Sequence, residues 1–592
     1  MVLKTYELKK DIPFQIYLLS DPSVKKISKE FLFYNVRIYR KEKTKTQTVC
    51  IDYPKGNLYW FVEFKKFIEK EVLSKDNTYE ANWKRLLRDL RMDIKKDFDT
   101  LNSELSFINK EEIIHTMLKY NLRDYQAFDL LQLLIKMRYS EHNSGLILSE
   151  QRTGKTRVAL AATLETLSKG ATCLVICPKS AQIGWLDEFI KMQDYVKDTL
   201  FTGGAVCKIS DIKNFEKEYN PDTINIRVVS YDLFKKFTLP QIKSLLNYNY
   251  KREVMVIGDE IHRLRNFKTL QSEALFNLKN IATKYRIKMS VLGVSGTPAV
   301  KESSDIFGSL SIINFSKIKF QPYWDSFNEF KEYFYVCEDT SFGKICKSLK
   351  RVDELNFLLR NCSIQTKQRE LDLFKGYTKK YMKITLNMDE DQRTIYDSVR
   401  DSKEFKDEID CENGLVQLIR LQQICIDPSG LVASYDKLSP KIEWVLKFIN
   451  SNKDLKFIIM AKKRKPLEHL ITVFDEKCIK YAYLKGGMLL KDRKEEIEKF
   501  KNDANVFLIQ QDTGRESLTL PQAFVTVFLD RDFVQGYNEQ AEARMTPVHG
   551  EICTKFVIDL VMKDTIEENI HNVLVNNKES IDSINKIYVK EE

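Results

Sequence analysis

Glycine and proline are sparse in this chain, with only 20 glycines and 13 prolines among 592 residues. Long disordered linkers, which are rich in such residues, are therefore not expected. The 11 cysteines form no CxxC pair, which argues against zinc sites and a disulfide framework and predicts reduced thiols. No apolar run reaches membrane-spanning length, and the opening residues MVLKTYELKK contain no apolar signal region. We therefore expect no membrane contact.

Charged residues make up 30% of the chain and hydrophobic residues 43%, the balance of a globular protein with room for several domains. Lys and Arg number 95 against 84 Asp and Glu, so the net charge is +11. This excess is compatible with a nucleic-acid partner but does not identify one. The high lysine content suits a bacterial virus or an AT-rich host, so we expect the protein in a bacterial cytoplasm or a virus-infected cell.

The apolar segments divide the chain into five parts. The first part, with a hairpin expected at 31–53 and a helix at 83–98, is predicted to be a small α+β accessory domain. The second and fourth parts alternate short strands with helices, which is typical of parallel sheets with crossover helices. The fold class is therefore α/β, with two such lobes and a mainly helical insert between them. The predicted boundaries are 1–112, 113–320, 321–435, 436–575 and a polar tail at 576–592.

Two series of apolar strands define the lobes. Ligands of open α/β sheets bind at the carboxyl ends of the strands, so functional residues are expected just after each apolar segment. The first series is predicted at 146–148, 173–177, 226–230, 254–258 and 291–295. The second series is predicted at 456–461, 480–484, 505–510, 525–530 and 555–561.

The stretch Gly145–Leu160, GLILSEQRTGKTRVAL, has the layout of a phosphate-binding loop between a strand and a helix. In such a loop, backbone N–H groups and the helix N-terminus face the phosphates. Lys155 would neutralise the β- and γ-phosphates, and the Thr156 hydroxyl would bind Mg²⁺. Ser149 stands where the full signature has glycine, so this motif requires partners elsewhere in the chain.

Asp259 and Glu260 supply the partners that a phosphate loop requires. They follow the apolar strand VMVIG, about a hundred residues after the loop. One carboxylate at a strand end can bind Mg²⁺ while its neighbour orients the attacking water. We assign the metal to Asp259 and the base to Glu260.

The segment GDEIHRLRN (258–266) resembles the DExH box of SWI/SNF-type ATPases, which belong to helicase superfamily two. Further segments resemble motifs of this family in the same order, over roughly residues 120–572. They include NLRDYQ (121–126), LVICPKSAQIGWLDEF (174–189), VVSYDLF (228–234), VSGTPAVKESSDIFGSLSIINF (294–315), DTGRESLTLPQA (512–523) and NEQAEAR (538–544).

The resemblance implies two RecA-like lobes with ATP and Mg²⁺ between them and nucleic acid, mostly double-stranded DNA, across both. Nucleotide contacts are implied for Arg123, Gln126, Thr153, Gly154, Lys155, Thr156, Arg157 and Gly514. Nucleic-acid contacts are implied for Lys179, Ser180, Ser230, Tyr231 and Thr519. Residues that link the two sites are implied to be His262, Ser295 and Thr297.

Gln540 and Arg544 are implied to reach the γ-phosphate from the second lobe, where phosphoryl transfer needs added positive charge. The family usually has a second arginine three residues after the first, and this chain has Pro547 there. The expected function is an ATP-dependent nucleic-acid motor, a DNA-stimulated ATPase that translocates on duplex DNA to remodel DNA or displace bound protein. The alternatives are a DNA-binding two-lobe clamp with weak or absent hydrolysis and a helicase-like transcription or replication factor that acts on RNA polymerase. A protein partner would bind through residues 1–112.

Overall fold

The computed structural model describes four short strands before residue 52 and then residues 103–574. Within the second range it leaves gaps at 141–142, 197–200, 213–216, 247–248, 266–268, 297–302, 314–326, 341–342, 351, 369–370, 372–374, 402–413, 487, 489, 512–519 and 548–552. Near the N-terminus, β1 (Lys4–Thr5) pairs with β2 (Ile16–Tyr17), and β3 (Val36–Lys41) pairs with β4 (Thr46–Ile51), both antiparallel. The second pair confirms the predicted hairpin, whereas the helix predicted at 83–98 lies outside the described residues.

Lobe one is built on a parallel sheet with the strand order β13-β5-β10-β9-β6-β8-β7 among the described residues. The five predicted strands are confirmed. Two more were not predicted, because FTGGAV contains two glycines and β13 has only two residues. The strands are β5 (Gly145–Ile147), β6 (Thr172–Cys177), β7 (Phe201–Val206), β8 (Ile224–Ser230), β9 (Glu253–Asp259), β10 (Lys288–Val294) and β13 (Ser363–Ile364).

Both faces of the lobe one sheet are covered by helices, which explains why its strands are continuous apolar runs. Val175 faces one core and its neighbour Ile176 faces the other, as the alternation of a strand requires. The first core contains α4 (Lys110–Tyr120), α5 (Asp124–Tyr139), α6 (Lys155–Thr166) and α7 (Gln182–Gln193). The second contains α9 (Tyr231–Phe234), α10 (Leu239–Leu245), α11 (Leu270–Lys284) and α12 (Ile306–Ile313).

Four short 3-10 helices complete lobe one at the strand ends and turns. They are η3 (Lys179–Ala181), η4 (Ile209–Asp211), η5 (Ile261–Arg265) and η6 (Ser303–Asp305), counted within the described ranges. Two of them, η3 and η5, follow β6 and β9 directly. They therefore lie at the carboxyl edge of the sheet, where ligands are expected.

The part predicted as a mainly helical insert also contains strands, so that prediction was incomplete. Its helices are α13 (Phe327–Phe334), α14 (Val352–Cys362), α15 (Glu390–Arg400), α16 (Gly414–Ile426) and the 3-10 helix η9 (Pro428–Gly430). An antiparallel hairpin, β11 (Tyr335–Thr340) and β12 (Gly343–Leu349), lies among them. Two further strands join the lobes, β13 in lobe one and β14 (Tyr377–Leu386) in lobe two. The chain therefore passes between the lobes through residues 365–376.

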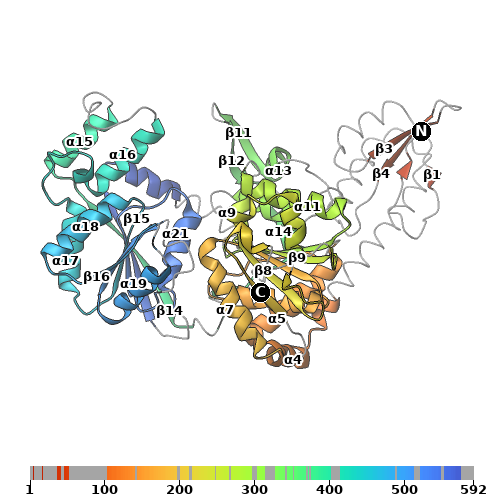
Figure 1. The fold of residues 1–592 in the computed structure, drawn as a ribbon. Coiled ribbons are helices and arrows are strands. Elements are labelled where there is room, and N and C mark those ends of the chain that lie inside the picture. The colour runs from red at the N-terminus through yellow and green to blue at the C-terminus, as the bar shows by residue number, and fades with distance from the viewer. Residues whose placement is uncertain are drawn as a thin grey trace.

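Lobe two is built on a second parallel sheet, apart from the sheet of lobe one (Figure 1). Its strand order within the described residues is β14-β19-β18-β15-β17-β16. The five predicted strands are confirmed as β15 (Phe457–Ala461), β16 (Tyr481–Leu484), β17 (Val506–Gln510), β18 (Val525–Phe528) and β19 (Cys553–Met562). Its helices are α17 (Pro440–Ser451), α18 (Arg464–Glu476), α19 (Leu490–Asn502), α21 (Gln535–Glu542) and the 3-10 helix η10 (Ala543–Met545).

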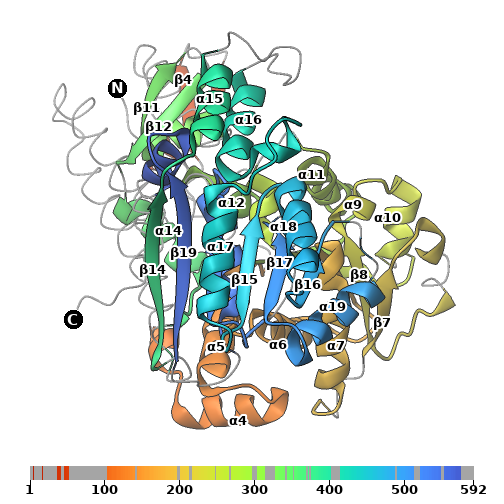
Figure 2. The same cartoon turned by 90° about the vertical axis from the view of Figure 1, so that its left-hand side faces the viewer.

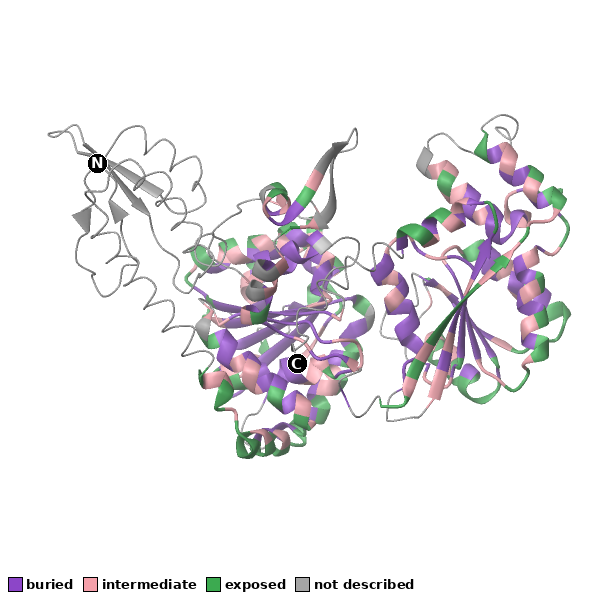
Figure 3. Cartoon of the chain, turned by 180° about the vertical axis from the view of Figure 1, so that it is seen from behind, coloured by how far each residue is buried: buried purple, intermediate pink, exposed green. Residues whose placement is uncertain are grey.

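The sixth strand, β14, was missed because its sequence, YTKKYMKITL, does not read as an apolar strand. It pairs in parallel with β19 along its whole length, from Tyr377 opposite Cys553 to Leu386 opposite Met562 (Figure 2). At the edge of the sheet most of its side chains face solvent, while the inner strands of both lobes are buried (Figure 3). Lysines on an edge strand oppose pairing with other chains.

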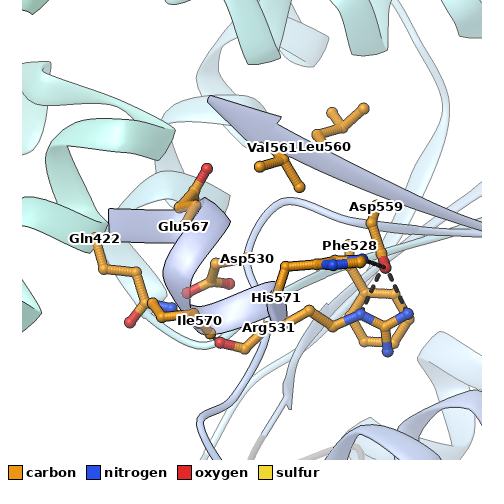
Figure 4. A pocket seen from close by; sticks show the side chains of 10 residues that line it. All are labelled: Gln422, Phe528, Asp530, Arg531, Asp559, Leu560, Val561, Glu567, Ile570 and His571. Carbon is orange, nitrogen blue, oxygen red and sulfur yellow. Dashed lines mark hydrogen bonds and ion pairs between the residues drawn. The ribbon is translucent and has the colours of Figure 1, made fainter. Parts of the chain in front are cut away.

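A small cavity, partly open to solvent, lies in lobe two, and no predicted site residue lines it (Figure 4). It is strongly charged, because Arg531 forms ion pairs of 2.7 Å with both Asp559 and Glu542. The lining residues are Gln422, Phe528, Asp530, Arg531, Asp559, Leu560, Val561, Glu567, Ile570 and His571. The cavity therefore combines charged and apolar residues of lobe two and is separate from the predicted nucleotide site.

Asp530 is the least satisfied carboxylate of this cavity. Its side chain is buried, and Oδ1 accepts a hydrogen bond of 2.8 Å from the Lys462 N–H. Its Oδ2 accepts no hydrogen bond from any residue that the structure describes. Burial raises the pKa of Asp530 to about 7, and Glu567 adds to this effect while Lys462 and Lys441 oppose it.

We expect Asp530→Asn to stabilise the protein above neutral pH. The unfolded chain ionises this carboxyl near its ordinary pKa of 3.8, so the wild type loses stability between that pH and about 7, and Asn removes the loss. The gain in unfolding free energy should be at least about 1 kcal/mol at pH 8 and vanish near pH 4. Thermal unfolding at both pH values measures it. The exposed Asp503→Asn is the control, and a gain of equal size at pH 4 would contradict the explanation.

Candidate functional site

The loop between β5 and α6 has the backbone that a phosphate cradle needs. Arg152 and Gly154 adopt left-handed conformations, with φ of 68° and 80°. At Gly154 the positive φ strains any other residue, and a Cβ atom, 2.0 Å from Nε2 of Gln126, would also displace that side chain. The loop then enters α6 at Lys155, so the first N–H groups of that helix open toward the space in front of the loop.

Gln126, predicted to contact adenine, is held against this loop. Its Nε2 donates a hydrogen bond of 2.9 Å to the Thr153 carbonyl, and its Oε1 accepts one of 3.0 Å from the Arg123 N–H. Tyr125, which was not predicted, donates to the same Thr153 carbonyl at 3.1 Å. The structure therefore brings Arg123, Gln126, Thr153 and Gly154 together.

Lys155 points into the loop. Its Nζ donates a hydrogen bond of 3.0 Å to the Glu150 carbonyl, which also accepts one of 2.8 Å from the Thr153 hydroxyl. Burial lowers the pKa of Lys155, and the nearby carboxylates of Glu260 and Asp259 oppose that effect. The ammonium group is thus close to both acidic residues. Gly296 leaves room for it, because a Cβ atom there would lie 3.1 Å from Nζ.

Asp259 ends β9, near the centre of the sheet. Its Oδ2 accepts a hydrogen bond of 2.9 Å from Nε1 of Trp185, and its backbone carbonyl accepts one of 2.8 Å from the Tyr231 hydroxyl. Burial raises the pKa of Asp259, and the negative charge of Glu260 adds to this effect. Trp185, near the start of α7, is buried in the core and also orients the proposed metal ligand, a role that its sequence motif does not reveal.

Glu260 is held in a left-handed backbone conformation, with φ of 51°. Such conformations are strained for residues other than glycine and gather at functional sites. Its Oε2 lies 3.3 Å from Nδ1 of His262, and that Nδ1 lies 3.0 Å from the Ser295 hydroxyl. Burial alone would raise the pKa of Glu260, but the hydrogen bond from His262 and the charges of Lys155 and Arg544 outweigh burial, so the pKa lies below its ordinary value. Glu260 is therefore ionised at neutral pH.

The donor set fits a magnesium ion only together with a nucleotide. The described residues contain no group of three or more His, Cys, Asp or Glu side chains that could hold a metal alone. Mg²⁺ usually binds through one or two carboxylates, several waters and substrate phosphates. The crowded charges of Asp259 and Glu260, beside the Thr156 position, match that requirement. Asp259 and Thr156 would hold the ion.

The second lobe contributes Gln540 and Arg544, both of which are buried. They lie in α21 and η10, and the ion pair of 2.7 Å between Glu542 and Arg531 holds the end of α21. The charge of Arg544 contributes to the lowered pKa of Glu260, so its guanidinium lies within electrostatic reach of lobe one. Pro547, buried three residues later, offers no charge.

Other predicted residues lie away from the loop or serve the fold. Arg157 ion-pairs with Glu188 at 3.2 Å and so ties α6 to α7. Ser230 caps α9 by accepting from the Leu233 N–H, and Tyr231 is buried under Asp259. Lys179 is exposed at the start of η3, next to Ser180. Thr297, Gly514 and Thr519 lie outside the described residues.

Family models match two parts of this chain. The SNF2-related domain matches residues 115–430, and the helicase conserved C-terminal domain matches residues 440–546. A curated relative, Chromodomain-helicase-DNA-binding protein 1-like from Danio rerio, is 22% identical over 497 residues, which cover 78% of this chain and 44% of the relative. The DNA repair and recombination protein RAD54-like of Drosophila pseudoobscura pseudoobscura is 22% identical over 531 residues, or 80% of this chain and 65% of the relative.

A solved structure, the Sulfolobus solfataricus SWI2/SNF2 ATPase core in complex with double-stranded DNA, is similar with a TM-score of 0.32 and 18% identity. The similarity covers 80% of this chain and 95% of that one. The chain spans about half to two thirds of the length of the two curated relatives. No helix within the described residues is long and apolar enough to cross a membrane.

We expect Trp185→Phe to slow the hydrolysis of ATP by about tenfold or more. The substitution keeps the aromatic packing and removes the hydrogen bond to Asp259, and bonds to charged groups contribute about 1.5–3 kcal/mol. Phosphate release at saturating ATP, Mg²⁺ and duplex DNA measures the effect. Trp444→Phe, whose indole stacks on Phe448 in lobe two, is the matched control. A rate equal to that of the control would contradict the role of Trp185.

Proposed function

The chain belongs to the SNF2-related family, and on that premise we propose that it is an ATP-driven motor that translocates on double-stranded DNA. The movement would remodel DNA or displace a bound protein. One observation carries the proposal: Lys155, Asp259 and Glu260 meet at one edge of the lobe one sheet, within electrostatic reach of Arg544 from lobe two.

The residues have separate tasks in the proposed hydrolysis. Lys155 would leave the Glu150 carbonyl and bind the β- and γ-phosphates, because a phosphate oxygen is the stronger acceptor. Mg²⁺, held through Asp259 and Thr156, supplies a positive charge that offsets the charge of the phosphates when it is bound. The main chain of the loop would donate its N–H groups to the same oxygens.

Glu260 would orient the attacking water through its carboxylate oxygens. The lowered pKa of Glu260 suits this task, because the ionised carboxylate can accept a hydrogen bond from the water. A strong base is not required, because the transition state of phosphoryl transfer is loose and catalysis depends mainly on positioning. His262 in η5 would hold the carboxylate through Nδ1, and Ser295, which follows β10, bonds the same nitrogen of His262. Arg544 would stabilise the charge that develops on the γ-phosphate, and it can do so only when the lobes are closed.

Double-stranded DNA is the proposed substrate because the printed names of the relatives refer to DNA binding and DNA repair, and the net charge of +11 agrees with a polyanion. The exposed Lys179 and the neighbouring Ser180 are proposed to contact the strand, together with Thr519. Ser230 and Tyr231 would support the DNA site from the layer below the surface, since both side chains are buried. His262, Ser295 and Thr297 are proposed to couple the DNA site to Glu260.

Several finer proposals rest on the sequence alone. A protein partner is proposed to bind through residues 1–112, and RNA polymerase is one candidate. A viral or phage origin and a cytoplasmic location are proposed from composition. Gly514 is proposed as a nucleotide contact from its place in the family motif, and Arg157 as a support of the loop through its ion pair with Glu188.

We expect Lys155→Ala to lower DNA-stimulated ATP hydrolysis at least about a hundredfold, because it removes the positive charge beside the phosphates. Phosphate release with duplex DNA, single-stranded DNA and RNA, compared side by side, measures the loss and identifies the preferred nucleic acid. Lys169→Ala, an exposed lysine after α6, is the control. The motor proposal fails if the wild type shows no turnover with any of the three nucleic acids.

Pro547 favours a second function, a DNA-binding clamp that hydrolyses ATP only slowly. The two functions differ in what Arg544→Ala does. For the motor, we expect a loss of about a thousandfold in turnover with unchanged DNA binding, since Arg544 would be the one arginine of this motif left to act. For the clamp, the wild-type turnover is already low and Arg544→Ala changes it little. Turnover and duplex binding measured on the same preparations decide between them.

A further inference from the structure

The chain that leaves lobe one runs along the phosphate loop before it reaches lobe two. The strand β13 pairs in parallel with β5, with Ser363 opposite Leu146 and Ile364 opposite Ile147. The pairing continues past both strands, because the Leu148 N–H donates to the Ile364 carbonyl at 2.8 Å and the Glu150 N–H donates to the Thr366 carbonyl at 2.9 Å. We name residues 363–368 the connector start.

Side chains add three further bonds between the connector start and the loop. Gln368 donates from Nε2 to the Gln151 carbonyl at 2.7 Å, and its backbone N–H donates to Oε2 of Glu150 at 2.8 Å. The Thr366 N–H donates to the Ser149 hydroxyl at 3.0 Å. Ser149 is the residue that departs from the phosphate-loop signature, and a glycine there could not accept this bond.

Glu150 is the centre of these contacts. Its N–H is bound by Thr366 and its carboxylate by Gln368, while its carbonyl accepts the Lys155 ammonium. The connector start therefore holds the residue whose carbonyl accepts the Lys155 ammonium. A change in the connector start is passed to Lys155 through a single residue.

The other end of the connector also reaches the loop. Residues 365–376 lead into β14, whose first residue is Tyr377. Burial raises the pKa of Tyr377 to about 12, and the positive charge of Arg152 in the loop opposes this rise, so Tyr377 lies within electrostatic reach of Arg152. The phosphate loop is thus hydrogen-bonded to the connector start and lies within electrostatic reach of the first residue of the edge strand of lobe two.

We propose that Thr366 and Gln368 are positioning residues of the phosphate loop, and that the connector start transmits the position of lobe two to Lys155. The inference rests on the proposed function, since it concerns how the same loop binds nucleotide. It adds a covalent route between the lobes to the electrostatic interaction of Arg544 with Glu260. A displacement of β14 pulls on the connector and alters the bonds that hold Glu150.

The test compares Gln368→Ala with Gln365→Ala in the full chain. Gln365 is the matched control, because it is partly buried on the same segment and no hydrogen bond joins its Oε1 to any described residue. Without nucleotide, we expect Gln368→Ala to speed amide hydrogen exchange of residues 148–152 several-fold. We also expect a three- to tenfold weaker affinity for Mg-ADP, the amount that one or two lost hydrogen bonds produce. Gln365→Ala should change neither value.

A second measurement distinguishes a positioning role of Gln368 from a role in the stability of the fold alone. In the wild type, we expect duplex DNA to change the exchange of residues 148–152, and Gln368→Ala should reduce that response while the thermal midpoint stays within a few degrees. If Gln368→Ala folds poorly, Ser149→Ala takes its place. It removes only the hydroxyl that Thr366 binds and should change exchange and Mg-ADP affinity in the same direction.

Equal exchange and equal Mg-ADP affinity in Gln368→Ala and Gln365→Ala would overturn the proposal. Lack of turnover in the wild type would instead count against the motor, since the exchange comparison needs neither DNA nor hydrolysis.

Discussion

The pairing of β5 on both of its edges is the constraint on which the nucleotide site depends. This strand has only three residues, yet β10 binds one edge and β13 the other. All three residues are buried, so the loop that follows starts from a fixed point in the sheet. Ser295, which follows β10, and Thr366, which follows β13, then bind the backbone next to the loop. The geometry around Lys155 thus comes from strands that are distant in sequence and adjacent in the sheet.

Crowded charge is the second consequence of this arrangement. Parallel strands end at one edge, so Asp259, Glu260 and Lys155 lie close enough to change one another's pKa. Burial raises the pKa of Asp259 and lowers that of Lys155, and both shifts oppose the charged forms. A bound nucleotide with Mg²⁺ would compensate these charges. We therefore expect bound nucleotide and Mg²⁺ to raise the free energy of unfolding of lobe one, as is typical of preorganised sites.

The region between the lobes is more than a helical spacer. Its first strand completes the lobe one sheet and its long strand β14 completes the lobe two sheet, so each lobe includes chain from that region. Tyr381 on β14 donates a hydrogen bond of 2.9 Å to Glu542, which lies two residues before Arg544. Strand β14 therefore touches the element that carries the proposed γ-phosphate arginine, while the connector start touches the phosphate loop. Both halves of the proposed site are linked to one segment.

The sequence by itself determined the two sheets, since continuous apolar runs such as VMVIG must be buried on both faces, and it identified Lys155, Asp259 and Glu260 because their motifs are local. It also predicted ten strands, which are confirmed. Only the tertiary structure showed that β14 is a strand, because an edge strand with solvent on its side chains carries no apolar signal. The roles of Trp185, Gln368 and Ser149 were equally hidden. Each acts through a contact with a residue far away in the chain, and such contacts depend on which strands become neighbours.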